Sequence, residues 1–154
     1  MQTFLPYPDI VKSIKCLDNK RLGKQRVEAY QIYKIVSGQD SESRWKNHPA
    51  VKMWLYHPAA IAMYMNIAIN EWCQRGYINN MKYILHPIGL KLLSHKEDNL
   101  HNFIDIQGIV NFPWWIGNEE FHNAHKSNLL RKMPEHYSKF GWDVPNNLPY
   151  VWPV

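Results

Sequence analysis

Residues 17 to 29, LDNKRLGKQRVEA, decide how the rest of the chain is organised. Asp18 is a good N-cap residue and helix formers follow it as far as Val36, so this stretch predicts the start of a helix that stops at Gly38. At about 100° per residue, cations and a glutamate share one face of that helix, beside an apolar stripe. Glu28 is therefore expected at the boundary between core and solvent. The charged face holds Arg21, Lys24 and Glu28, and the apolar stripe holds Leu22, Ala29, Ile32 and Val36.

The charged face has an ordinary interpretation and a functional one. The ordinary interpretation is a solvated helix surface with an i,i+4 ion pair between Lys24 and Glu28. The functional one is an acid held among cations, with Arg21, Lys24 and Arg26 placed to bind phosphates near Glu28. An α-amino group has a pKa of about 7.7–8.0 against about 10.4 for lysine, so the amine of Met1 is a chemically sensible nucleophile beside such an acid.

Composition and charge set the broad class of the protein. The chain has 154 residues, of which 45% are hydrophobic and 14% aromatic, and this profile predicts one folded domain over residues 1–154. The net charge of +5 fits a polyanionic partner. No apolar run is long enough to span a bilayer, and the start MQTFLPYPDI lacks the features of a signal peptide. Cys16 and Cys73 make no disulfide framework, so we expect free thiols and an intracellular protein without membrane contact.

Proline, glycine and capping signals predict an all-α, compact helical domain with long irregular connections. Residues 1–10 contain two prolines and predict an extended N-terminal arm, ending just before the Asp18 helix and able to fold back onto it. The best amphipathic pattern starts at His57-Pro58 and ends at Gly76, so we interpret it as the core helix. Residues 77–116 predict loops and short turns. The other expected elements are a segment from Asn47-His48-Pro49 to about Tyr56, a capping box at Ser94–Glu97, a helix from Asn118 to about Lys132, and a short turn over Glu135–Phe140.

Two further groups of side chains suggest chemistry. His122 and His125 share a predicted helix face near Glu120, which leaves a divalent-metal site open as an alternative, although neutral histidines there more often contact backbone or phosphate. Aromatic side chains, among them Trp114-Trp115 and the Tyr137, Phe140 and Trp142 group, are able to stack on bases, although core packing is their commoner use. The cations expected to contact phosphates in this half are Lys126, Arg131, Lys132 and Lys139.

The order of these blocks resembles the pyrimidine-dimer DNA glycosylases, the family of the phage endonuclease that acts on ultraviolet-damaged DNA. The blocks that carry the resemblance are Leu17 to Glu28, NHPAV at 47–51, IAINEWCQRGY at 67–77 and HYSKFG at 136–141. A longer branch of the family is also similar in its FLPYPD start, its FHNAHKSNLLRK block and its LPYVWP end. Residues 77 to 116 have no counterpart in the compact phage protein.

The resemblance implies a fold and a mechanism. Family members are compact all-α proteins that cut the glycosidic bond of a cyclobutane pyrimidine dimer and then cleave the abasic strand by β-elimination, without a metal or other cofactor. It implies an N-terminal amine as nucleophile, here that of Met1, and Glu28 as the essential acid. We expect a monomer acting on duplex DNA. The residues expected to contact DNA are Arg21, Lys24, Arg26, His48, Lys126, Arg131, Lys132, Lys139 and Trp142.

The chain departs from the phage pattern at its start. Residue 2 is Gln, whose bulk disfavours removal of the initiating methionine, so our hypothesis is that Met1 stays and provides the amine; Lys24 is the next candidate. Arg21 stands where the phage protein has a histidine, and Val27 and Gln31 stand where it has arginines. Three alternatives stay open: a glycosylase for another damaged or modified base, a metal-dependent nuclease, and a non-catalytic nucleic-acid-binding protein.

Overall fold

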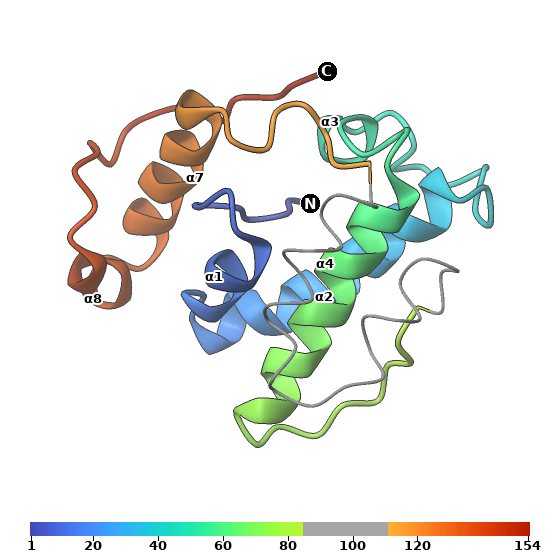
Figure 1. The fold of residues 1–154 in the computed structure, drawn as a ribbon, viewed down its shortest axis with the longest axis horizontal. Helices are drawn as coiled ribbons and strands as arrows, with labels where there is room; N and C mark the ends of the chain where they lie inside the picture. The colour runs from blue at the N-terminus through green and yellow to red at the C-terminus, as the bar shows by residue number, and fades with distance from the viewer. Residues whose placement is uncertain (85–110) are drawn as a thin grey trace.

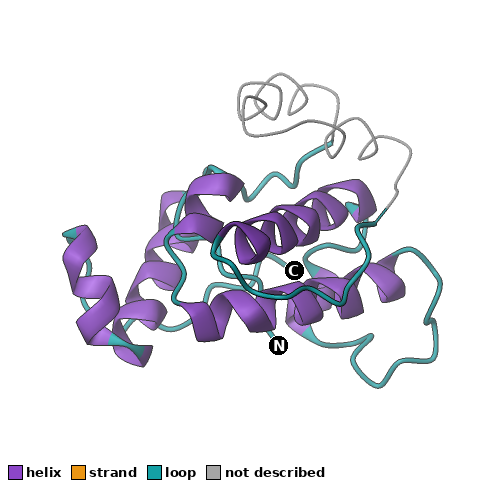
Figure 2. Ribbon diagram, turned by 90° about the horizontal axis from the view of Figure 1, so that it is seen from below, coloured by secondary structure: helices purple, strands orange, loops and turns teal. Residues whose placement is uncertain are grey.

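The computed structural model describes residues 1–84 and 111–154, and it confirms the all-α expectation for them. These residues form helices and loops and contain no strand (Figure 2). The elements are α1 (Ile10–Lys15), α2 (Asn19–Val36), α3 (Pro49–Lys52), α4 (Pro58–Gln74), α7 (Glu119–Lys132), α8 (Pro134–Tyr137) and the 3₁₀ turn η2 (Ser138–Phe140). None of these helices has the length and apolar character needed to cross a membrane. The capping box predicted at Ser94–Glu97 lies outside the described residues.

α2 and α4 pack against each other and form the centre of the fold (Figure 1). The Asp18 carboxylate caps α2 by accepting from the Arg21 N–H, as the sequence predicts, and Gly38 follows the helix with a φ of 82°. A Cβ atom on Gly23 would lie 3.2 Å from the ring of Trp72. The absence of a side chain at Gly23 therefore lets α2 approach α4 closely at this point.

α4 is the core helix that the sequence predicts. Every residue from 60 to 69 is buried, so this helix is enclosed on all sides rather than on one face. Gly76, with a φ of 87°, follows its last turn. Tyr64, fully buried in the middle of α4, joins this helix to the N-terminal arm through a hydrogen bond to the Phe4 carbonyl.

The structure contains one short helix that the sequence does not predict. Within the region predicted as an arm and connection, Ile10–Lys15 forms α1, capped by the Asp9 side chain and buried through Ile10 and Ile14. Its sequence, IVKSIK, is short and rich in β-branched residues, so packing rather than propensity holds the helix. The segment predicted from Asn47 to about Tyr56 contains α3 over Pro49–Lys52, followed by turns as far as Tyr56.

The C-terminal part confirms the predicted helix after Asn118 and the short turn after Pro134. Asn118 caps α7, which ends at Lys132, and α8 with η2 covers residues 134–140. An extended tail then returns along α7 toward α3 (Figure 1). Arg131 donates to the carbonyls of Asn146 and Leu148 and so fixes this tail to α7. Cys16 and Cys73 are free thiols, as expected.

Candidate active site

The first residues of the chain lie across α2 and are held there by side chains. The Gln2 N–H donates to Glu28 Oε2 at 3.0 Å, and the Phe4 N–H donates to Gln25 Oε1 at 2.8 Å. The Tyr64 hydroxyl shares its single proton between the Phe4 carbonyl oxygen, at 2.9 Å, and Gln25 Oε1, at 2.6 Å. These bonds fold the start of the chain back onto α2 and bring it to Glu28.

Two histidines of α7 hold the next residue of the arm from the other side. The Leu5 N–H donates to His125 Nδ1 at 2.9 Å, and the Leu5 carbonyl lies 2.7 Å from His122 Nδ1. Two residues earlier in the arm, the Thr3 hydroxyl accepts from the Trp54 indole N–H at 3.0 Å. The arm therefore has its backbone groups paired with side chains from three helices, although no neighbouring strand pairs with it among the described residues.

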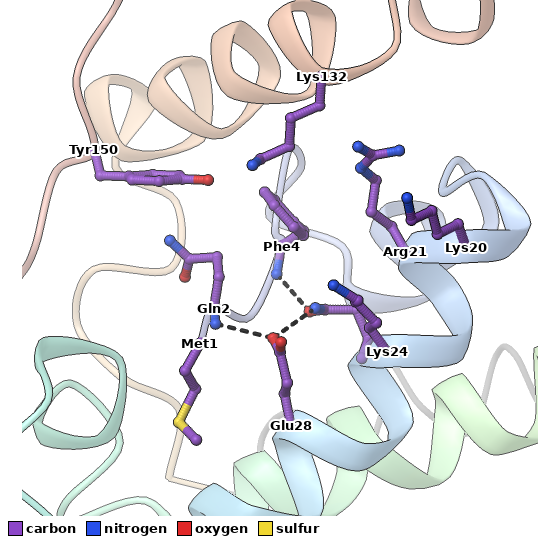
Figure 3. A pocket seen from close by; sticks show the side chains of 10 residues that line it. Met1, Gln2, Phe4, Lys20, Arg21, Lys24, Glu28, Lys132 and Tyr150 are labelled. Atoms are coloured by element: carbon purple, nitrogen blue, oxygen red, sulfur yellow. Dashed lines mark hydrogen bonds between the residues drawn. The ribbon is translucent and has the colours of Figure 1, made fainter. Parts of the chain in front are cut away.

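A cavity of about 300 Å³ opens where the arm, α2, the end of α7 and the C-terminal tail meet (Figure 3). Figure 3 shows Glu28 on one side of this cavity and Lys132 on the other, with Gln2 between Glu28 and Tyr150. Burial raises the pKa of the Tyr150 phenol, so this ring is a neutral wall of the cavity. The lining residues are Met1, Gln2, Phe4, Lys20, Arg21, Lys24, Gln25, Glu28, Lys132 and Tyr150.

Glu28 is the acidic residue of this cavity. Its Oε2 atom accepts from the Gln2 N–H and, at 3.3 Å, from the Gln25 side-chain amide. Its Oε1 atom has no hydrogen bond to any residue that the structure describes, and the side chain is half-buried. The carboxylate is thus fixed by one oxygen and presents the other to whatever enters the cavity.

The other ionised side chains of the cavity are cations. Lys20, Lys24 and Lys132 form no ion pair with any residue in the described ranges, so the ordinary Lys24–Glu28 pair is not made there. Arg21 pairs with Asp18 at 3.3 Å. Burial works to raise the pKa of Asp18, but a hydrogen bond from the Tyr137 hydroxyl and the charge of Arg21 outweigh it and hold the pKa below its ordinary value. Such an excess of unpaired positive charge favours an anionic ligand.

Eight of the eleven predicted site residues fall into two groups in space. Five of them line the cavity, namely Met1, Glu28, Arg21, Lys24 and Lys132. A second group lies on the aromatic side chains Tyr7, Trp142 and Phe140, which we call the Tyr7 surface. The Trp142 indole N–H donates to the Tyr7 hydroxyl, and Lys126 Nζ is 5.3 Å from the Tyr7 ring centre. Lys139 lies over Phe140, whose ring stacks on Trp142. Three predicted site residues, Lys126, Lys139 and Trp142, thus lie on the Tyr7 surface, whereas five line the cavity.

The remaining predicted residues make structural contacts. Arg26 stacks over Trp72 at 4.2 Å and donates to Asn79, and Arg131 holds the tail. His48 caps α3 by accepting from the Ala50 N–H, with its ring edge-on to Trp152. Burial lowers the pKa of His48, the positive charge of the amino terminus lowers it further, and Glu28 acts in the opposite sense. His48 therefore lies within the field of both Met1 and Glu28.

The histidines considered as metal ligands contact backbone instead. His122 bonds to Leu5 and Gly117, His125 bonds to Leu5, and both rings are buried. Glu120 is exposed, and within the described ranges no three His, Cys, Asp or Glu side chains are grouped to hold a metal ion. Trp115 is buried in the core, whereas Trp114 is exposed.

Five residues of the cavity were not among the predicted site residues: Gln2, Phe4, Lys20, Gln25 and Tyr150. Lys20 and Gln25 had a signal in the sequence, since each stands one helical turn from Lys24 or Glu28 on α2. Gln2 and Phe4 follow Met1 in the arm. Tyr150 lies more than a hundred residues from Glu28 in the sequence, and no local pattern joins the two.

A comparison with protein families identifies the family of the chain. A family model described as pyrimidine dimer DNA glycosylase matches residues 1–85, which is more than half of the chain and includes α1 to α4 with Met1 and Glu28. No curated protein and no solved structure matches the chain.

Proposed function

The chain belongs to the pyrimidine dimer DNA glycosylase family, and from this premise we propose that the cavity beside Glu28 is the active site of a DNA glycosylase with abasic-site lyase activity. The proposed substrate is a pyrimidine dimer in duplex DNA. The observation that supports this most strongly is the hydrogen bond of 3.0 Å between the Gln2 N–H and Glu28. It brings the residue that carries the α-amine, Met1, to the acid of the cavity.

The proposed reaction begins with attack by the Met1 amine. Its nitrogen forms a bond to C1′ of the damaged nucleotide while the bond from C1′ to the base breaks, and the base leaves with the electron pair. Opening of the sugar ring gives an iminium that joins Met1 to C1′. Loss of a proton from C2′ then breaks the bond from C3′ to its oxygen, and the phosphate leaves with that electron pair. Water hydrolyses the remaining imine and restores the amine.

Glu28 has the geometry to assist these steps. The free Oε1 atom faces the cavity, where it is able to take a proton from the attacking amine and return one to the sugar oxygen as the ring opens. When ionised, it also stabilises the positive charge of the iminium. Gln25 and the Gln2 N–H hold the carboxylate in place, so little reorientation is needed during the reaction.

The cations of the cavity suit the phosphates on either side of the damaged nucleotide. Lys20 and Lys24 line it from α2, and Lys132 lines it from the end of α7, so positive charge approaches from two elements (Figure 3). Phosphate contacts position the strand, and the target nucleotide leaves the base stack to reach C1′. The Tyr7 surface, with Lys126, Lys139 and Trp142, is proposed as a further contact with the duplex.

A strand-incision assay tests this function. The protein should cut the damaged strand of a duplex that contains one cyclobutane pyrimidine dimer, whereas an undamaged duplex should stay intact. Glu28→Gln should lower the rate by about 10²- to 10⁴-fold. Glu135→Gln, an exposed acid on α8 outside the cavity, is the matched control and should react like the wild type.

Two results would contradict the proposal. Incision of a duplex that carries another damaged base, with none at the dimer, would overturn the proposed lesion. Equal rates for Glu28→Gln and the wild type would overturn the role of the cavity. The intact mass of the purified protein tests the nucleophile separately, because a mass without Met1 would rule out its amine.

A further inference from the structure

We propose that His122 and His125 are positioning residues that fix the register of the N-terminal arm and so hold the Met1 amine in the cavity. This inference rests on the proposed function, since it matters only if that amine reacts. Neither histidine lines the cavity, and the reaction described above uses neither side chain. Both are buried on α7, with exposed fractions of 3% for His122 and 0% for His125.

The two histidines bind one residue of the arm at both of its backbone groups. His125 Nδ1 accepts from the Leu5 N–H at 2.9 Å, and His122 Nδ1 lies 2.7 Å from the Leu5 carbonyl oxygen. His122 and His125 are three residues apart and so share a face of α7. They hold Leu5 as a neighbouring strand would hold it, although the described residues contain no strand.

The hydrogen bonds require a different tautomer in each ring. His122 Nε2 accepts from the Gly117 N–H at 2.9 Å, so its proton is on Nδ1, which donates to the Leu5 carbonyl. His125 accepts through Nδ1, so its proton is on Nε2. Each ring therefore fits only one of the two Leu5 groups. A shift that brought Pro6 to this place would leave His125 Nδ1 without a donor, because proline has no N–H. A shift that brought Phe4 here would break its bonds to Gln25 and Tyr64.

The unpaired Nε2 atom of His125 indicates that the ring keeps the tautomer that the hydrogen bond to Leu5 requires. Its Nε2 is buried and has no hydrogen-bond partner among the described residues. The ring is surrounded by aromatic side chains, with centroid distances of 4.3 Å to Phe121 and 5.9 Å to both Phe4 and Tyr150. Phe4 and Tyr150 are walls of the cavity. A buried N–H without a partner is costly. His125 carries this cost because its proton must be on Nε2 for Nδ1 to accept from the Leu5 N–H.

The register of the arm has direct consequences for the amine. Only residues 1–4 lie between Leu5 and the amino terminus, and successive residues of an extended chain are about 3.3 Å apart. A slip by one residue would move the amine by that distance, while misplacement by about 1 Å already costs about 10²-fold in rate. Restraint of Leu5 thus determines where the nucleophile is found.

A matched pair of variants separates the two bonds of His122. In His122→Asn the amide nitrogen takes the place of Nδ1 and is able to donate to the Leu5 carbonyl, but the bond to Gly117 is lost. In His122→Gln the amide oxygen takes the place of Nε2 and accepts from Gly117, but the bond to Leu5 is lost. The measurement is the single-turnover rate of borohydride trapping on a duplex with one abasic site, together with the Kd for that duplex and the Tm of each variant.

We expect His122→Gln to be trapped about 10- to 100-fold more slowly than His122→Asn, with Kd values for the two variants within about twofold. Equal rates for the two variants, or rates that follow their Tm values, would overturn the inference. If His122→Gln does not fold, His125→Asn and His125→Gln give the same comparison, since only asparagine places an acceptor at the Nδ1 position. Trapping of the wild type tests the proposed function separately. If the wild type forms no adduct at Met1, that function is overturned. If it forms the Met1 adduct but His122→Asn and His122→Gln react at equal rates, only this inference is overturned.

Discussion

At the scale of single residues, the site depends on side chains that form hydrogen bonds with the backbone of the N-terminal arm. Glu28, Gln25 and the two α7 histidines each accept from or donate to a backbone group of residues 2–5. Buried backbone groups without partners are costly, so these side chains determine where the arm lies. The chemistry of Glu28 and the position of the amine therefore follow from the same set of hydrogen bonds.

The neutral state of His125 predicts a dependence of stability on pH. Burial lowers the pKa of His125 to about 3 and also lowers that of His122. Below pH 6.5 the unfolded chain takes up protons at these residues before the folded protein does, so the free energy of unfolding should fall as pH falls from 6.5 toward 3. The expected slope is about 1.4 kcal/mol per pH unit for each histidine that titrates only in the unfolded chain.

Urea unfolding at a series of pH values between 7.5 and 4 measures this slope. His125→Asn, which keeps an acceptor for Leu5 and does not titrate, should show a shallower slope than the wild type. A free energy of unfolding that stays constant across the series, or the same slope in His125→Asn, would show that His125 is not held neutral in the fold.

At the scale of elements, α2 is joined to α8 through its capping residue. The Tyr137 hydroxyl donates to Asp18 Oδ1 at 2.5 Å and accepts from the Asp18 N–H at 3.1 Å. Tyr137 is fully buried, and its pKa is raised by burial and by the hydrogen bond to Asp18. This contact holds the N-terminal end of α2 against α8, which directly follows α7. The cavity residues Arg21 and Lys132 lie on α2 and α7.

Removal of this hydroxyl should destabilise the protein. Tyr137→Phe leaves a buried carboxylate with one partner fewer, and the expected loss is about 1–3 kcal/mol in the free energy of unfolding. Tyr33→Phe is the matched control, because Tyr33 is also a buried tyrosine, on α2, and its hydroxyl has no hydrogen bond to the described residues. Urea unfolding of both variants checks the prediction, and equal losses would refute it.

The sequence could predict the elements whose signals are local. The sequence predicts the Asp18 and Asn118 caps, the proline at the first position of α4 and the glycines after α2 and α4, because each of these signals acts on its own helix. α1 was missed because its six residues are held by burial rather than by propensity. The charged face of α2 was predicted, but Lys132 and Tyr150 meet it only in the folded chain. Local periodicity cannot indicate such partners.

At the scale of the whole molecule, positive charge gathers where the first and last parts of the chain meet. The cavity is lined by Lys20, Arg21 and Lys24 from α2 and by Lys132 from α7, with Glu28 as its acid. Because each phosphate contact releases counterions, binding to DNA should weaken steeply as salt increases. The family of the chain, a family of DNA glycosylases, agrees with this arrangement.

Lys132 should contribute one phosphate contact. Lys132→Ala should be made in the Glu28→Gln background, so that the duplex is bound but not cut. The fall of log K for DNA binding with log salt concentration should become shallower, with the magnitude of the slope smaller by about 1. Lys46→Ala, which removes an exposed lysine paired with Glu42 outside the cavity, should leave the slope unchanged. Binding titrations at several salt concentrations measure both, and an unchanged slope for Lys132→Ala would place this lysine outside the DNA interface.

The most direct measurement is borohydride trapping on a duplex with one abasic site, followed by peptide mapping of the adduct. The proposed mechanism predicts a covalent adduct on the α-amine of Met1, which Glu28→Gln should weaken or abolish. An adduct on a lysine, with Lys24 the first to inspect, would contradict the assignment of the nucleophile. The absence of any adduct, in a protein that still binds the duplex, would contradict the lyase mechanism itself.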